Sequence, residues 1–264
     1  MTRADILQHA REMSYDGIEL HAGVEPYPSA QDVAGVRALR ERIEGYGLQI
    51  AGIQSAVRMG NAISENPMER AAYAQGVREQ IDLVKALGGD FVGVWPAGKQ
   101  PQLCDEVIVE RLSDTFSQCA PYAEQQGIII AMEPEPVQVD YNYEIALAVI
   151  DCVGSSYFTV LYDCTHANVI SGGDPISVIH MLKGHIGHVH LADNDGDVLD
   201  LPGASRSSKH LVFGEGNVDI NAVLQALRDV DYNGWIQVDV WENPAPFECS
   251  RRNKLIIEQI ISEL

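Results

Sequence analysis

Apolar residues along the chain gather in seven short runs, separated by longer stretches with helical periodicity. The short runs are rich in Val and Ile, and they occupy residues 17–21, 48–53, 91–95, 128–133, 157–163, 186–190 and 235–239. Runs that are apolar on both faces predict the buried strands of a parallel sheet. The longer stretches predict helices over residues 3–13, 31–45, 67–87, 105–126, 142–152, 175–183, 219–229 and 250–262.

Regular alternation of strand and helix fits either a closed β/α barrel or a doubly wound open sheet. No Gly-x-Gly-x-x-Gly turn follows the first strand, which disfavours a dinucleotide-binding sheet. A length of 264 residues suits one barrel as well as two small domains, and we expect one domain over residues 1–264. A closed barrel needs eight strands, so either the first strand is absent from this chain or another segment closes the barrel.

Four of the predicted strands end in residues that can bind a metal ion. These residues are Glu133, Asp163, His190 and Asp239. The carboxyl ends of parallel strands meet at one end of a barrel, where the active sites of such barrels lie. Carboxylates and an imidazole that converge there form a divalent-metal site. The alternative for Glu133 is a structural salt bridge, because a buried carboxylate must be compensated.

Other polar and aromatic residues near the strand ends are candidates for binding a substrate. We expect this role for Glu19, His21, Trp95, His166, His188, Asp193 and Arg206. Core packing is the alternative for several of them, and Glu135 is a candidate to support Glu133. Arg206, Lys209 and His210 lie in a long Gly/Ser/Asp-rich loop over residues 194–216, and one of them could reach the substrate, although such loops are often only lids.

Composition narrows the choice of function. The net charge of −20 disfavours binding to nucleic acid or to anionic lipid, and no apolar run is long enough to span a membrane. The N-terminus shows no signal-peptide pattern. The five cysteines are odd in number and form no Cys-x-x-Cys pair, which predicts reduced thiols in a cytoplasmic protein.

Six motifs, in order along the chain, resemble the xylose isomerase-like barrel superfamily of sugar isomerases, 3-epimerases, inosose dehydratases and endonuclease IV. The motifs are Tyr15–His21, Met132–Pro136, Asp163–Ala167, His188–Asp193, Gly214–Asp219 and Tyr232–Asp239. The resemblance implies an eight-stranded (β/α)₈ TIM barrel in which the segment ending at His21 is the second strand.

The same resemblance implies that Glu133, Asp163, His190 and Asp239 are the metal ligands, and it selects His190 over His188. The family mostly has Glu where Asp239 stands. The shorter Asp239 could bind the metal directly, bind it through water, or yield the role to Glu242.

We expect a metal-dependent isomerase or epimerase that acts on a keto-sugar or polyol. Mn²⁺, Mg²⁺ or Co²⁺ suit such a site, and Zn²⁺ also fits. The metal would stabilise an enediolate, while Glu133 and Asp239 remove and return a proton on opposite faces of one carbon. The alternative is dehydration of a keto-inositol, or another β-elimination on the same site.

Two further alternatives are an endonuclease IV-like nuclease, which the net charge disfavours, and a non-catalytic sugar-binding subunit. We expect a small carbohydrate as the partner, without nucleic acid or membrane, and the family resemblance suggests a homo-oligomer. The basic residues that could bind a substrate phosphate are Arg58, Lys99, Arg206 and Lys209, but none lies in a phosphate-loop pattern, which favours an unphosphorylated substrate.

Overall fold

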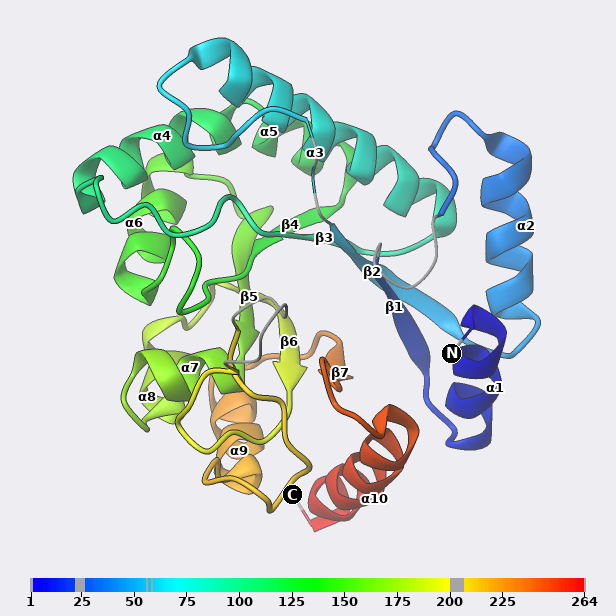
Figure 1. The fold of residues 1–264 in the computed structure, drawn as a ribbon. Coiled ribbons are helices and arrows are strands. Elements are labelled where there is room, and N and C mark those ends of the chain that lie inside the picture. The colour runs from blue at the N-terminus through cyan, green and yellow to red at the C-terminus, as the bar shows by residue number, and fades with distance from the viewer. Residues whose placement is uncertain (1, 22–26, 56, 58, 200–206, 264) are drawn as a thin grey trace. The chain divides into compact units, whose positions relative to one another are not determined.

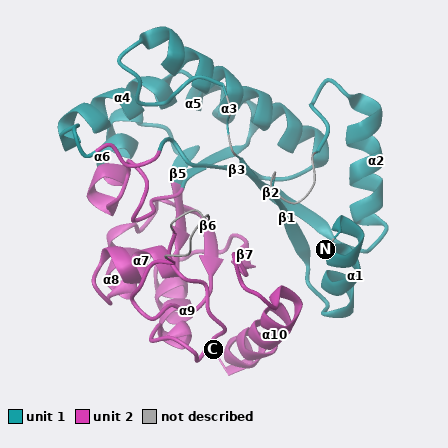
Figure 2. Cartoon of the chain, viewed as in Figure 1, with its two compact units in different colours: residues 1–97, 101–132, 148–159 teal, residues 98–100, 133–147, 160–264 magenta. Residues whose placement is uncertain are grey.

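The computed structural model of the protein is drawn in Figure 1, and the residues that it describes are 2–21, 27–55, 57, 59–199 and 207–263. Two of the basic residues named above, Arg58 and Arg206, lie outside the described residues. The chain divides into two compact units (Figure 2), of which the first comprises residues 1–97, 101–132 and 148–159. The second comprises residues 98–100, 133–147 and 160–264.

The first unit contains four parallel strands in chain order. They are β1 (Gly17–His21), β2 (Gln49–Ser55), β3 (Phe91–Val94) and β4 (Ile129–Met132). Its helices are α1 (Arg3–Glu12), α2 (Val33–Glu44), α3 (Pro67–Leu87), α4 (Asp105–Ser117) and α5 (Ala120–Gln126). Strands β2 and β3 are buried along almost their whole length, as the unbroken apolar runs predict.

Local sequence fixes the ends of α3, the longest helix of the first unit. The Asn66 side chain accepts a hydrogen bond from the amide of Met68, and Pro67 occupies the first turn, where no amide donor is needed. At the other end Gly88 has a φ of 86°, a left-handed conformation that favours glycine and ends the helix. Caps of this kind explain why the predicted range of 67–87 agrees with the observed one.

The second unit contains the remaining parallel strands and most of the later helices. Strand β5 (Phe158–Asp163) starts in the first unit and continues here beside β6 (Ile186–Leu191) and β7 (Ile236–Val238). The helices that lie wholly in this unit are α7 (Cys164–Ile170), α8 (Pro175–Met181), α9 (Ile220–Asp229) and α10 (Pro246–Glu263). Helix α6 (Tyr143–Val153) starts in this unit and ends in the first.

All seven predicted strands are present, within two residues of the predicted bounds, but one predicted helix is broken in two and one observed helix was not predicted. The helix predicted over 105–126 is broken into α4 and α5, because Pro121 lies in the first turn of α5 and cannot continue the preceding helix. Helix α7 was not predicted, since its seven residues directly follow β5 without any intervening turn signal. None of the described helices is both long enough and apolar enough to cross a membrane.

Candidate active site

The four strand-end residues lie together in the second unit. Strand register brings Asp163 opposite His190 on β5 and β6, and the amide of Asp239 donates to the carbonyl of Leu191 just beyond the end of β7. The Nδ1 atom of His190 lies 3.4 Å from Glu133 Oε1, 3.9 Å from Asp163 Oδ2 and 3.6 Å from Asp239 Oδ2. Three carboxylates therefore surround one imidazole nitrogen.

The carboxylate of Asp163 is divided between a structural role and the centre of this cluster. Its Oδ1 atom accepts hydrogen bonds from the amide and hydroxyl of Thr165, at 2.6 and 2.7 Å, and from the amide of His166 at 3.3 Å. These bonds cap the first turn of α7. Its Oδ2 atom remains directed at the two imidazoles of His190 and His210.

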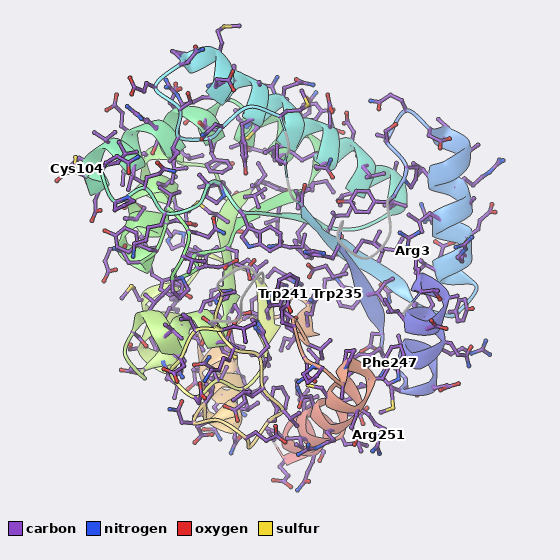
Figure 3. The ribbon with its side chains drawn as sticks, in the orientation of Figure 1. Arg3, Cys104, Trp235, Trp241, Phe247 and Arg251 are labelled. Atoms are coloured by element: carbon purple, nitrogen blue, oxygen red, sulfur yellow. The ribbon has the colours of Figure 1, made fainter. Side chains whose placement is uncertain are left out.

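Asp239 is fixed in a similar way at the end of β7. Its Oδ1 atom accepts a hydrogen bond from the amide of Trp241 at 2.9 Å, which leaves Oδ2 for the cluster. Figure 3 labels Trp241 and Trp235, the two tryptophans that flank β7 in the chain. Glu242 is exposed and has a φ of 53°. The contact between Asp239 and His190 favours Asp239 over Glu242 as the member of the cluster.

His166 lies beside Glu133 and Glu135. Its Nε2 atom is 3.7 Å from Glu133 Oε1 and 3.9 Å from Glu135 Oε1, while its Nδ1 atom is 2.8 Å from the Ser208 hydroxyl. Glu135 in turn accepts a hydrogen bond from the hydroxyl of Ser207 at 3.1 Å. Ser207 of the long loop therefore holds Glu135, and Ser208 holds His166.

Two described segments of the loop between β6 and α9 pair with each other in antiparallel fashion. We call residues 193–199 and 207–211 the clasp, because isolated antiparallel bridges join Asp193 to Leu211 and Val198 to Ser208. Asp193 itself accepts hydrogen bonds through both carboxylate oxygens from four backbone amides, at 2.8–3.0 Å, namely those of Asn194, Gly214, Gly216 and Val218.

His210 belongs to the second segment of the clasp, residues 207–211, and its ring contacts Asp163 and Asp239. Its Nε2 atom lies 3.3 Å from Asp163 Oδ2 and 3.5 Å from Asp239 Oδ2, and its Nδ1 atom lies 2.9 Å from the carbonyl oxygen of Ser208. The ring is buried. Its spacing in the sequence relative to the strand ends gave no signal of this contact, since an irregular loop fixes no register.

The charges of the cluster shift the pKa values of its members. Burial alone would raise the pKa of Asp163, but the imidazoles of His166, His210 and His190 hold it well below its usual range. Burial would lower the pKa of His210, yet the carboxylates of Asp239, Asp163 and Glu133 raise it to about 9. Burial lowers the pKa of His166, although the carboxylates of Asp163 and Glu133 oppose this shift.

Burial raises the pKa of Glu135 well above its usual value, and the nearby Glu133 carboxylate adds to the rise. Asp140, on the same loop after β4, is fully buried, and burial raises its pKa in the same way. Sequence analysis did not single out Asp140. The cluster as a whole therefore holds an excess of buried acid that a cation would compensate.

The other predicted substrate-binding residues have different surroundings. His188 is buried on β6, with its ring 5.1 Å from that of His190. His21 and Trp95 lie in the first unit, where their rings are 5.7 Å apart, and Glu19 lies on β1 of that unit. Their contact with a substrate stays a prediction, as does that of Arg206, which lies outside the described residues.

The two candidate phosphate-binding lysines that the structure describes are engaged elsewhere. The Nζ atom of Lys209 lies 2.8 Å from Asp195 and 3.2 Å from Asp197, on the surface of the clasp. The Nζ atom of Lys99 lies 4.6 Å above the ring of Tyr141. The two aspartates offset the positive charge of Lys209, and the Lys99 ammonium is held over the Tyr141 ring.

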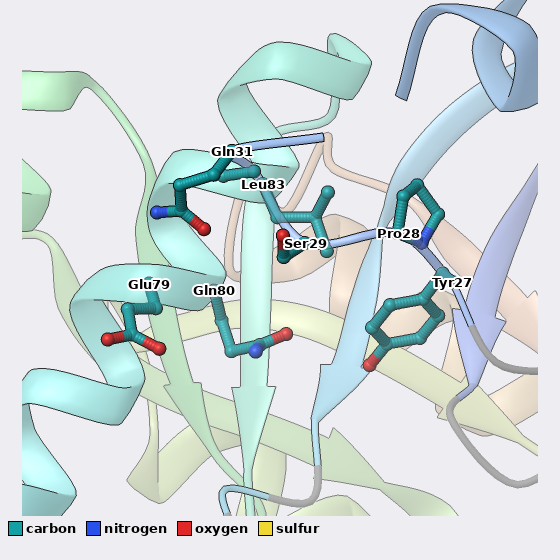
Figure 4. A pocket seen from close by; sticks show the side chains of 8 residues that line it. Tyr27, Pro28, Ser29, Gln31, Glu79, Gln80 and Leu83 are labelled. Atoms are coloured by element: carbon teal, nitrogen blue, oxygen red, sulfur yellow. The ribbon is translucent and has the colours of Figure 1, made fainter. Parts of the chain in front are cut away.

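A hollow of about 210 Å³ in the first unit has a different character (Figure 4). It lies between residues 27–31 and helix α3, and its acidic and amide side chains are Glu79, Gln80 and Gln31. This lining contains no histidine or cysteine. Among the described residues, the cluster of the second unit is therefore a better candidate for a metal site than this hollow.

The cluster in the second unit fits a divalent cation. Glu133, Asp163 and His190 offer ligand atoms that all lie within 4.8 Å of one another, and all three are buried. The Oδ1 atoms of Asp163 and Asp239 each accept a hydrogen bond from a backbone amide, so one oxygen of each carboxylate is left directed at the centre. Oxygen donors with imidazole suit Mn²⁺, Co²⁺, Mg²⁺ or Zn²⁺.

Comparison with known proteins places these features in a family. A family model described as xylose isomerase-like TIM barrel matches residues 7–260. An inosose dehydratase of Geobacillus kaustophilus is 22% identical over 287 residues, covering 100% of this chain and 89% of the relative. A fructoselysine 3-epimerase of Shigella flexneri is 23% identical over 239 residues, covering 88% of this chain and 82% of the relative.

Among solved structures, that of the IOLI protein with a binding zinc atom has a TM-score of 0.78 at 17% identity, covering 100% of this chain and 94% of that chain. At this identity the likeness shows the fold alone. The predicted resemblance and the predicted barrel class are thus confirmed by the family match: the chain belongs to the xylose isomerase-like TIM barrel family.

Proposed function

We propose that this protein is a metal-dependent epimerase or isomerase of a keto-sugar or related polyol. The observation that carries the proposal is that Glu133 and Asp239 each direct a carboxylate oxygen toward the same nitrogen of His190, at 3.4 and 3.6 Å. Two carboxylates at one buried centre can exchange a proton with a carbon held between them. The relative named fructoselysine 3-epimerase supports this reaction class.

In the proposed reaction, one carboxylate removes the proton next to the substrate carbonyl and the other returns a proton. Return on the opposite face of the same carbon gives an epimer, and return at the adjacent carbon gives an aldose–ketose isomer. Glu133 is buried, whereas the side chain of Asp239 is 19% exposed. We assign proton removal to Glu133 and proton return to Asp239, since the more exposed acid exchanges protons with solvent more readily.

The residues that would hold the cation are Glu133, Asp163, His190 and Asp239. When bound, a divalent cation supplies Lewis-acid stabilisation of the negative charge that develops on the substrate oxygens. The zinc atom bound to the IOLI protein supports adding Zn²⁺ to Mn²⁺, Co²⁺ and Mg²⁺ as candidates. His166 would position a substrate hydroxyl, because its ring is fixed by Ser208, whose hydroxyl lies 2.8 Å from the Nδ1 atom.

A dehydratase of a keto-inositol is the second candidate. One observation favours it: the resemblance places Glu where this chain has the shorter Asp239. A β-elimination needs one base to remove the proton and loses a hydroxyl in place of regaining a proton, so it depends less on a second carboxylate of full length. The relative named inosose dehydratase supports this candidate.

The two candidates are separated by the mass of the product. Purified protein is analysed for bound metal, then incubated with a panel of keto-sugars and inososes after addition of Mn²⁺, Co²⁺ or Zn²⁺. A product of unchanged mass supports an epimerase or isomerase, and a product lighter by one water supports the dehydratase. Absence of bound metal together with absence of turnover would contradict both and favour a non-catalytic sugar-binding role.

The cellular location and the oligomeric state of the protein are also proposals. We propose a cytoplasmic location because the number of cysteines is odd. All five are free thiols in the structure. We also propose that the protein forms a homo-oligomer, which size-exclusion chromatography with light scattering would test.

A further inference from the structure

We propose that the hollow of the first unit binds a small primary amine in its ammonium form, carried on a short aliphatic stem. The hollow lies between residues 27–31 and helix α3 and has a volume of about 210 Å³ (Figure 4). All of its described lining belongs to the first unit, so the inference is independent of the metal cluster and of the proposed function. Pockets for drug-sized ligands have roughly 300–1,000 Å³, so this smaller hollow suits a ligand of a few heavy atoms.

The side chain of Gln80 brings an unpartnered hydrogen-bond acceptor to the hollow. Its Oε1 atom is buried and receives no hydrogen bond from any residue that the structure describes. In Figure 4 the Gln80 amide lies between the side chain of Glu79 and the ring of Tyr27, with its oxygen on the Tyr27 side. Leaving a buried acceptor unpaired costs free energy. The partner that this oxygen lacks is therefore an N–H or O–H group of a ligand.

The charge of the lining favours a cationic donor. Glu79 contributes a carboxylate, and the described residues of the lining include no lysine, arginine or histidine. The Oε1 atom of Glu79 accepts a hydrogen bond from the Gln75 side chain at 3.5 Å, a long bond that leaves most of the carboxylate's capacity for a ligand. Tyr27 adds an aromatic ring, and the faces of such rings attract ammonium groups. An anionic ligand is disfavoured by the same lining.

The apolar part of the lining favours an organic cation over a metal ion. Pro28, Ala30 and Leu83 contribute hydrocarbon surface to the hollow. A divalent ion such as Ca²⁺ takes about six to eight oxygen ligands, for which one carboxylate with a few amide and hydroxyl oxygens is a poor set. An alkylammonium ion matches both parts, because its head can bind the acceptors while its stem covers the apolar surface.

The wall opposite α3 is built without a ligand. The amide of Asp32 donates to the carbonyl oxygen of Ser29 at 3.0 Å, and Asp32 Oδ1 accepts from the amide of Gly35 at 2.9 Å, where α2 begins. A Cβ atom at Gly35 would collide with the Asp32 carboxylate, so glycine permits this close turn. These bonds tie residues 29–32 to the start of α2. A ligand would therefore meet a preformed wall, which lowers the entropy cost of binding.

The test is a titration of the full-length, ¹⁵N-labelled protein followed by nuclear magnetic resonance. The probe is butylammonium, and butan-1-ol and butyrate serve as neutral and anionic probes of similar size. We expect saturable shifts of the Gln80 side-chain amide and of the Leu83 backbone amide with butylammonium. Binding of butan-1-ol should be about tenfold weaker, because hydrogen bonds from a charged donor are the stronger ones. Butyrate should give no saturable shift at these two residues.

Two variants and a matched control assign the binding to this hollow. Gln80→Met removes the acceptor at nearly constant side-chain length, and Glu79→Gln removes the charge, so each should weaken butylammonium binding about tenfold. Glu124→Gln removes the same charge from an exposed position on α5 and should leave binding unchanged. The urea midpoint of Gln80→Met should not fall, since no described residue donates to the atom that is removed. That result separates loss of binding from unfolding.

The absence of a saturable shift at Gln80 would overturn the inference. Equal affinities for butylammonium and butan-1-ol would also overturn it, because the carboxylate would then play no part. Binding that stays unchanged in both Gln80→Met and Glu79→Gln would show that the ammonium ion associates with the acidic surface at large, and this too would contradict the assigned site.

Discussion

The strand ends and the clasp reach the same centre by different physical routes. Asp163 and His190 lie opposite each other in the backbone ladder, and Glu133 and Asp239 directly follow the last residues of β4 and β7. His210 is placed by a loop whose shape depends on side-chain hydrogen bonds, above all those of Asp193. A group fixed by a ladder tolerates change in its neighbours, whereas a group fixed by a loop depends on each of the bonds that hold the loop.

This difference predicts which measured property responds first to a change in each region. The strand ends contribute the carboxylates that we assign to proton transfer, and changes there should affect turnover first. The clasp holds Glu135, His166 and His210 through Ser207, Ser208 and its own backbone. Changes in the clasp should affect stability and binding first, and turnover to a smaller extent.

The largest effect is expected at Glu133. Glu133→Gln keeps the size of the side chain but removes the base, so we expect turnover of the keto-sugar substrate to fall by about 10²–10⁴-fold. Circular dichroism should show an unchanged fold, which separates this result from unfolding. Turnover near that of the wild type would show that Glu133 is not the base.

The next largest effect is expected at Asp193, where the change should lower stability and not turnover, in contrast to Glu133. Asp193→Ala leaves four backbone amides of the clasp without their acceptor, and we expect the free energy of unfolding to fall by about 3 kcal/mol. Urea denaturation measures this loss. If stability is retained while substrate affinity alone decreases, Asp193 contacts the substrate, as the sequence suggested, and the clasp is held by other bonds.

The strand-end half of the site could be predicted from sequence, because a strand has a fixed period and its end is marked by the change from apolar to polar residues. Glu133 and His190 were found in this way, and the family resemblance agreed. His210 was named only as one of three loop residues that could reach the substrate. Its contacts with Asp163 and Asp239, and the role of Asp193 in holding the loop, could not be found, since no period relates a loop residue to its contacts. Likewise the break at Pro121 in the helix predicted over 105–126 was missed because the flanking apolar pattern continues through it.

A pH effect is expected in the protein stripped of metal. The carboxylates around buried His210 raise its pKa from 6.5 to about 9 in the folded state, so folding favours the protonated ring. This stabilisation is complete below about pH 6.5 and is lost as the pH rises through about 9. The urea midpoint of chelator-treated protein should therefore fall over this range, and it should fall less in His210→Gln. Equal slopes for both proteins would contradict the raised pKa.

A smaller effect is expected for Ser208→Ala. The change removes the hydroxyl that lies 2.8 Å from His166 Nδ1 but keeps the carbonyl that holds His210. Loss of one buried hydrogen bond costs about 1 kcal/mol, so kcat/KM should fall about fivefold with Zn²⁺ affinity unchanged. A large loss of metal affinity in this variant would show that the positions of His166 and His210 are coupled.

The smallest effect is expected for Lys209→Met. Its ion pairs with Asp195 and Asp197 lie at the surface of the clasp, and such pairs contribute about 0–1 kcal/mol. We expect the urea midpoint and kcat/KM to remain close to those of the wild type. A substantial decrease in kcat/KM would instead indicate that Lys209 binds the substrate.

The most direct test of the account is exchange of the substrate proton with solvent. A keto-sugar that the protein turns over is incubated in heavy water with metal-loaded protein, with chelator-treated protein and with Glu133→Gln. We expect deuterium to enter at the carbon next to the carbonyl only with the metal-loaded wild type. Conversion of the substrate without any deuterium uptake, or equal uptake after metal removal, would contradict metal-dependent proton transfer at this site.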